Sequence, residues 1–178
     1  MKFALRASPR STGARSLAET AERLHAAAVA GARDPRLYAD LGAPDSVEGR
    51  FELLTAHVIL ILERLRTAGP DNEPLRQALF DAYLSHLDGS MREMGVGDLA
   101  MGRRMKNLGE SFYGRAKGFA DAFAALPQTA ALEALLARTT FQGVQIAPGP
   151  LAAEMIARRE HLARMAAGPL VLEDVTWR

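Results

Sequence analysis

Residues 51–62 read FELLTAHVILIL, an apolar run that three polar residues interrupt. Charged residues flank this run in the longer segment 49–66, GRFELLTAHVILILERLR. The run is too short to cross a bilayer, since a spanning helix needs roughly 20 apolar residues. Apolar side chains would lie on nearly every side of a helix formed here. We therefore expect a buried central helix, capped by Asp45 or Ser46 and running to about Ala68.

The segments on either side of this run also have helical patterns. Ser16 and Glu19 have the spacing of a capping box, and apolar residues recur at intervals of three and four over most of the chain. No stretch alternates between apolar and polar residues for more than a few positions. The remaining helices are expected at about 16–31, 35–41, 74–94, 98–125, 129–138 and 150–165. The sequence thus predicts an all-α fold, a single-domain bundle of about seven helices with a long central hydrophobic helix.

The composition is that of one soluble globular domain. The chain has 178 residues, of which 48% are hydrophobic and 24% are charged. We expect a flexible basic arm over 1–15, a helical domain over 16–168 and a tail over 169–178. The arm carries basic residues and no acidic ones, which suits a frayed terminus, an organellar transit peptide, or a contact with anionic lipid or RNA. It lacks the sustained apolar stretch of a secretory signal, so we expect a cytoplasmic location.

Residue types that carry common chemistry are absent or scattered. There is no cysteine, which excludes disulfides, thiolate metal sites and thiol nucleophiles. The sequence has no HExxH, no G-x-S-x-G and no Walker-type loop. The four histidines, His25, His57, His86 and His161, are expected to be structural or surface residues. We predict that the chain is not an enzyme and has no catalytic residue, no cofactor and no metal ligand.

A basic block follows the glycine-rich turn at 95–97. Within 101–118, the five bases Arg103, Arg104, Lys106, Arg115 and Lys117 face only one acid, Glu110. Nucleic-acid binders usually add exposed aromatic side chains and a strongly basic domain. Here the aromatics are expected on the core face of the helix, and the net charge is only +1. A protein partner or an anionic membrane surface therefore fits this block better, and DNA is not expected.

Residues 79–115, LFDAYLSHLDGSMREMGVGDLAMGRRMKNLGESFYGR, together with the segment 49–66, form the most distinctive part of the chain. This part resembles the ubiquinol-cytochrome c chaperone family. The similarity extends over about residues 24–123. It is strongest in the REMGVGDL turn and in the later MK and FYGR elements.

The resemblance implies a bacterial-type factor for biogenesis of the cytochrome bc1 complex. Mitochondrial relatives hold newly made cytochrome b, and they work with a small partner protein near the ribosomal exit. The implied function is that of a non-enzymatic assembly chaperone that binds cytochrome b or an early assembly intermediate. A small partner chaperone, the ribosome and an anionic membrane surface are further candidate partners. Peripheral association with the inner membrane is a candidate location, on the matrix side if the source is eukaryotic.

The glycine turn and its flanks are the expected partner-binding region. Methionine is a soft side chain suited to adaptable contacts, and the basic flank suits anionic lipid or acidic loops. The candidate residues are Met94, Gly95, Val96, Gly97, Asp98, Arg103, Arg104, Lys106, Tyr113 and Arg115. Two other functions stay open at this point. One is an RNA- or ribosome-binding module that uses the basic arm and residues 103–117. The other is a helical haem-handling or metal enzyme that uses His57 or His86.

Overall fold

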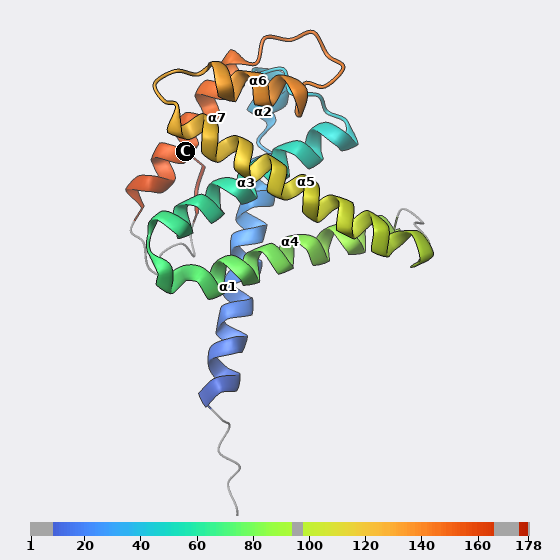
Figure 1. The fold of residues 1–178 in the computed structure, drawn as a ribbon, viewed down its shortest axis with the longest axis vertical. Coiled ribbons are helices and arrows are strands. Elements are labelled where there is room, and N and C mark those ends of the chain that lie inside the picture. The colour runs from blue at the N-terminus through green and yellow to red at the C-terminus, as the bar shows by residue number, and fades with distance from the viewer. Residues whose placement is uncertain (1–8, 94–97, 166–174, 178) are drawn as a thin grey trace, which may run out of the picture.

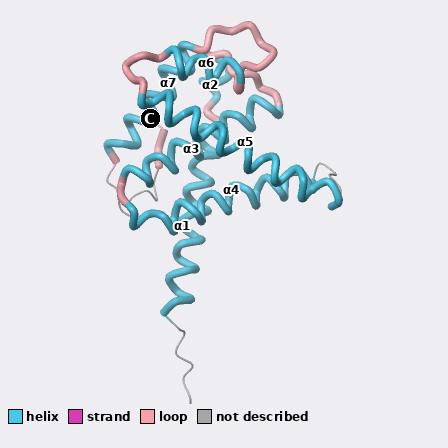
Figure 2. Tube along the Cα trace, viewed as in Figure 1, coloured by secondary structure: helices cyan, strands magenta, loops and turns pink. Residues whose placement is uncertain are grey.

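The computed structural model describes residues 9–93, 98–165 and 175–177. Within these ranges, helices and the loops between them make up the whole fold (Figure 2). The elements are α1 (Pro9–Ala32), α2 (Pro35–Ala39), α3 (Val47–Thr67), the 3-10 helix η1 (Pro70–Asn72), α4 (Glu73–Glu93), α5 (Asp98–Ala124), α6 (Ala130–Arg138) and α7 (Gly149–Arg164). The predicted all-α fold is confirmed.

Several helix ends follow directly from local chemistry. The Oγ atom of Ser46 accepts a hydrogen bond from the Gly49 N–H at 3.1 Å and so caps α3. A carboxylate oxygen of Asp34 accepts from the Arg36 N–H at 3.0 Å at the start of α2. Between α3 and η1, Gly69 has a φ of 125°, which favours glycine because it lacks a Cβ.

The first helix begins earlier than the sequence indicated. Ser16 was expected to start it, but α1 begins at Pro9 and Ser16 lies inside the helix. The backbone oxygen of Ser16 accepts a hydrogen bond from the Thr20 hydroxyl at 2.9 Å, a contact made within a helix. The proposed division into an arm, a helical domain and a tail stays a prediction.

Helix α3 lies at the centre of the molecule, as predicted. It contacts α1, α4, α5 and α7, and every residue from Thr55 to Ile61 is buried. Figure 1 shows α1 and α4 crossing below it, with α2, α6 and α7 gathered at the opposite end. No described helix is both long enough and apolar enough to cross a membrane.

Helices α4 and α5 diverge from their connected ends, which reach beyond the body of the molecule (Figure 1). This geometry divides the apolar face of α5, on which the sequence predicted core aromatics, into a buried and a half-buried part. Phe112, Phe119 and Phe123 are buried in the core, whereas Met105 and Leu108 nearer the connection are only half-buried. The first half of this apolar face is therefore less enclosed than the second half.

Candidate functional site

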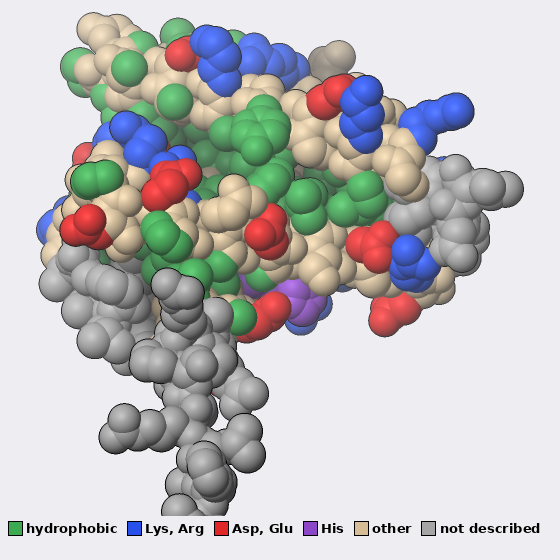
Figure 3. Space-filling model, turned by 60° about the horizontal axis from the view of Figure 1, so that its bottom comes forward, with side chains coloured by type: hydrophobic (Ala, Val, Ile, Leu, Met, Phe, Trp, Pro, Cys, Tyr) green, Lys and Arg blue, Asp and Glu red, His purple; other side chains and the backbone are tan. Residues whose placement is uncertain are grey.

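An apolar groove lies between α4 and α5, with α3 as its floor. Its cavity volume is about 450 Å³. Figure 3 shows a hollow in which hydrophobic side chains gather, with charged side chains of both signs around it. The groove is lined by Ile59, Leu62, Glu63 and Arg66 of α3, Glu73, Arg76, Gln77 and Phe80 of α4, and Phe112, Tyr113, Ala116, Lys117 and Ala120 of α5. We call this surface the α4–α5 groove.

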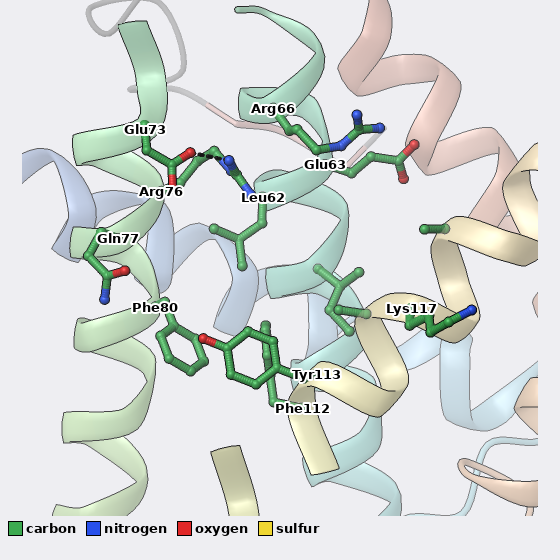
Figure 4. Close-up of a pocket in the computed structure, with 13 residues that line it drawn as sticks. Leu62, Glu63, Arg66, Glu73, Arg76, Gln77, Phe80, Phe112, Tyr113 and Lys117 are labelled. Atoms are coloured by element: carbon green, nitrogen blue, oxygen red, sulfur yellow. Dashed lines mark hydrogen bonds and ion pairs between the residues drawn. The ribbon is translucent and has the colours of Figure 1, made fainter. Parts of the chain in front are cut away.

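Three aromatic rings cluster in the lining of the groove. The ring centroids of Phe80 and Phe112 are 4.9 Å apart, and those of Phe80 and Tyr113 are 5.6 Å apart. Phe80 and Tyr113 meet across the groove from opposite helices, with Leu62 projecting from α3 (Figure 4). Tyr113 is 64% exposed, although it is a large aromatic residue. An exposed tyrosine beside an apolar cavity is a typical anchor of a protein-binding surface.

Charged groups surround the apolar floor. Glu73 and Arg76 form an ion pair at one end of the groove (Figure 4). The Nε atom of Arg76 is buried and has no hydrogen-bond partner among the described residues. On the opposite wall, Lys117 forms an exposed pair with Asp121 at 2.5 Å. The rim therefore offers donors and acceptors to a partner that covers the floor.

The structure brings one of the sequence-predicted site residues, Tyr113, into this groove. Met94, Gly95, Val96 and Gly97 lie outside the described residues. Asp98 is the first residue of α5, but its side chain also lies outside what the structure describes.

The predicted basic residues lie away from the groove lining. Arg103, Arg104 and Lys106 are exposed on the part of α5 nearest the connection to α4. Lys106 lies 3.8 Å from Glu110, one turn along the same helix. This exposed pair partly neutralises the charge of the block, and such pairs contribute little to stability.

Arg115 has a role within the fold. Its guanidinium forms a bidentate pair with the Glu52 carboxylate, in which Nε donates to Oε2 at 2.6 Å. It also lies over the Phe51 ring, 5.6 Å from the centroid. The hydrogen bond to Glu52 raises the pKa of Arg115. A partner that contacted Arg115 would have to compete with this link between α5 and α3.

His57 is a buried structural residue at 0% exposure. Its Nδ1 donates to the Leu53 carbonyl oxygen at 2.7 Å, which leaves Nε2 to accept from an Arg158 N–H at 2.6 Å. Desolvation by burial lowers the pKa of His57 to about 3. Arg158 also donates to Asp34 and Glu154, at 2.6 and 2.7 Å. These contacts give His57 a neutral, fully paired state in the core.

Comparisons with known proteins identify the family. A model of the family described as ubiquinol-cytochrome c chaperone matches residues 39–177. The chain belongs to the ubiquinol-cytochrome c chaperone family. A crystal structure of the Cbp3 homolog from Brucella abortus is similar, with a TM-score of 0.82 and 30% identity over 95% of this chain and 94% of that chain. A search of the curated proteins finds no match.

The region that the family model matches includes every residue that lines the α4–α5 groove, but it does not include α1. Sequence reasoning named Tyr113 but missed most of the groove, because it assigned the apolar residues of α4 and α5 to the core. The signal was present in the i, i+4 series Phe112, Ala116 and Ala120 on α5. That series marks an apolar face, but it does not say whether a neighbouring helix covers it.

Proposed function

We propose that this chain is a non-enzymatic assembly chaperone for the ubiquinol-cytochrome c reductase (cytochrome bc1) complex. In this proposal it binds cytochrome b or an early assembly intermediate, and the α4–α5 groove is the binding surface. Membership of the chaperone family supports the general role. The similar fold of the Brucella abortus Cbp3 homolog supports it as well. The exposed Tyr113 beside the apolar floor is the observation that carries the choice of surface.

The size of the groove suits one face of a client helix. An α-helix with its side chains is about 10–12 Å across, so a cavity of about 450 Å³ holds several side chains and leaves the rest of the helix outside. Amphipathic helices often bind by placing an apolar stripe in such a groove. A membrane subunit that has not yet been assembled presents apolar helix faces of this kind. The groove would cover part of one such face until the subunit is inserted or paired.

The charged rim suits the ends of a membrane helix, where charged loops begin. Arg76 and Lys117 can pair with acidic groups of a client, and Glu63 and Glu73 with basic ones. The exposed Arg103 and Arg104 are then available for an anionic membrane surface close to the client. The interaction with anionic lipid, and any contact with a small partner protein or the ribosome, stay proposals of their own.

The substitution Tyr113→Glu tests the groove. It places a charge beside the apolar floor, and we expect client affinity to fall by about tenfold or more, as for a central anchor residue. The measurement is recovery of cytochrome b with the tagged chain from membranes in mild detergent, with b-type haem absorbance reporting the assembled complex. The matched control is Val144→Glu, an exposed apolar residue in the loop between α6 and α7, which should retain client recovery.

Two outcomes would count against the proposal at different levels. Equal client recovery for Tyr113→Glu and Val144→Glu would remove the groove as the binding surface. Normal bc1 content and a normal cytochrome b spectrum after deletion of the gene would overturn the function itself.

A further inference from the structure

Two histidines and a glutamate meet between α1 and α4, outside the α4–α5 groove. Glu22, His25 and His86 each offer one ligand atom, and these three atoms lie within 4.8 Å of one another. Glu22 and His25 are three positions apart on α1, so they share a face of that helix. His86 comes from α4, which packs against α1 (Figure 1). We propose that these three side chains bind a divalent transition-metal ion, with zinc as the best-matched ion.

His25 provides an independent observation at this position. Its side chain is buried, at 5% exposure, and its Nε2 atom has no hydrogen-bond partner among the described residues. Buried polar atoms in folded proteins are nearly always paired, and an unpaired one often marks the place of a water molecule or an ion. A neutral imidazole nitrogen is among the commonest metal ligands in proteins. Metal binding would therefore give this buried imidazole a polar partner that the described residues do not supply.

The other two ligands are exposed and can adjust. The Nε2 atom of His86 lies 2.8 Å from Oε2 of Glu22, so these two groups are already in contact. The rings of His25 and His86 are stacked nearly parallel, with centroids 4.2 Å apart and an interplanar angle of 7°. Nitrogen lone pairs lie in the ring planes, so one ring must turn before both can point at the same ion. His86 is free to turn because its side chain is 52% exposed.

The donor set matches the chemistry of zinc. Two imidazole nitrogens and one carboxylate oxygen are the ligands of many three-ligand zinc sites, in which the fourth position stays open. Imidazole also accepts copper and nickel, whereas magnesium and calcium prefer oxygen ligands alone. His25 and His86 both line a second cavity, of about 690 Å³, so water or a partner's side chain can reach the open position.

Metal binding would act on the fold, because the ligands come from two helices. The ion would join α1 to α4 at the point where Glu22 and His86 already meet. From the sequence we predicted no metal ligand, yet residues 22–25 read ERLH, a Glu-x-x-His spacing. The third side chain of the cluster could not be read from this spacing, because His86 lies 64 positions after Glu22 in the chain.

The test uses the full chain after treatment with a chelator, with Zn²⁺ as the probe. Equilibrium dialysis followed by metal analysis should give one Zn²⁺ per chain, and thermal unfolding should move to a higher Tm when Zn²⁺ is added. His86→Gln and Glu22→Gln should each weaken binding by about tenfold or more. Both residues are exposed, so these variants should fold. His161→Gln, on α7 and outside the cluster, is the matched control and should bind as the unmodified chain does.

Absence of stoichiometric binding would overturn the proposal. Equal affinity for Zn²⁺ in His86→Gln, Glu22→Gln and the unmodified chain would do so as well, because the ion would then be bound elsewhere. The groove variant Tyr113→Glu should bind Zn²⁺ normally. Failure of the metal site and failure of the client-binding groove can therefore be told apart.

Discussion

At the scale of single residues, His57 is the clearest case of a side chain whose charge state the fold dictates. It lies between the Leu53 carbonyl oxygen and the Arg158 guanidinium, which also pairs with Asp34. A second positive charge beside Arg158 would be poorly solvated there. The native state therefore resists binding a proton at His57.

This resistance predicts a dependence of stability on pH. The pKa of His57 is about 3 in the folded chain and 6.5 for an ordinary histidine, so between these values the unfolded chain binds more protons. The free energy of unfolding should therefore fall as the pH drops below about 6.5, by up to about 1.4 kcal/mol per pH unit from this group alone. Urea unfolding at pH 7, 6 and 5 measures this slope. His57→Gln should lose that share of the slope, and an unchanged slope in the variant would contradict the assignment.

At the scale of helices, the Glu52–Arg115 pair joins α3 to α5 at one wall of the fold. Both side chains are largely enclosed, with 10% and 22% of their surface exposed. Because α5 carries Tyr113 two positions before Arg115, this pair also helps to fix the wall of the α4–α5 groove. Arg115, which the sequence suggested as a client contact, therefore also has a structural role beside Tyr113.

Arg115→Met should reveal the structural value of this pair. Removing the guanidinium leaves the Glu52 carboxylate enclosed without its partner, and we expect a loss of about 1–3 kcal/mol, below the range for a fully buried pair because both groups retain some solvent contact. Chemical denaturation measures this loss. Lys106→Met removes the exposed pair with Glu110 and is the control, with a change expected within about 0.5 kcal/mol. An equal loss of stability in the two variants would show that the Glu52–Arg115 pair contributes no more to stability than the exposed pair.

At the scale of the whole molecule, Trp177 ties the C-terminal part of the described chain to the second half of α1. The indole N–H of Trp177 donates to the Ala27 carbonyl oxygen at 2.7 Å. The Trp177 ring also packs edge-on against His57, with centroids 4.7 Å apart, and lies beneath the Arg158 guanidinium. Helices α1, α3 and α7 thus meet Trp177 at one cluster.

The packing of Trp177 against His57 requires a glycine at position 31, and an alanine substitution can test this. A Cβ atom there would lie 2.4 Å from Nε1 of Trp177 and 2.7 Å from Cδ2 of His57. We expect Gly31→Ala to destabilise the chain by about 1–3 kcal/mol through overpacking. Gly89→Ala on α4 is the control, because nothing lies within 4 Å of its Cβ position, and its better helix propensity should stabilise the chain by up to about 1 kcal/mol. A shift of Tm in the same direction for both variants would contradict this account.

Local chemistry explains why the sequence predicted most helices but not the α4–α5 groove or the contact between Glu22 and His86. The Ser46 cap and the apolar run of α3 are encoded within a few neighbouring residues, and both appear as expected. The start of α1 was placed too late because a serine followed by a glutamate also fits inside a helix. The α4–α5 groove depends on how far two helices diverge, and the contact between Glu22 and His86 joins residues far apart in the chain. The spacing of apolar residues within one segment determines neither how far two helices diverge nor which distant residues come into contact.

The position of Trp177 has a practical consequence for spectroscopy. It is the single tryptophan of the chain, and the chain has no cysteine. A cysteine introduced at a chosen surface position would be the single thiol of the chain and could carry an acceptor dye. Trp177 would then be the single tryptophan donor for fluorescence energy transfer to that dye. The indole is anchored in the cluster of α1, α3 and α7. With the dye on a wall of the α4–α5 groove, a change in the efficiency of energy transfer on client addition would report movement of that wall relative to this cluster.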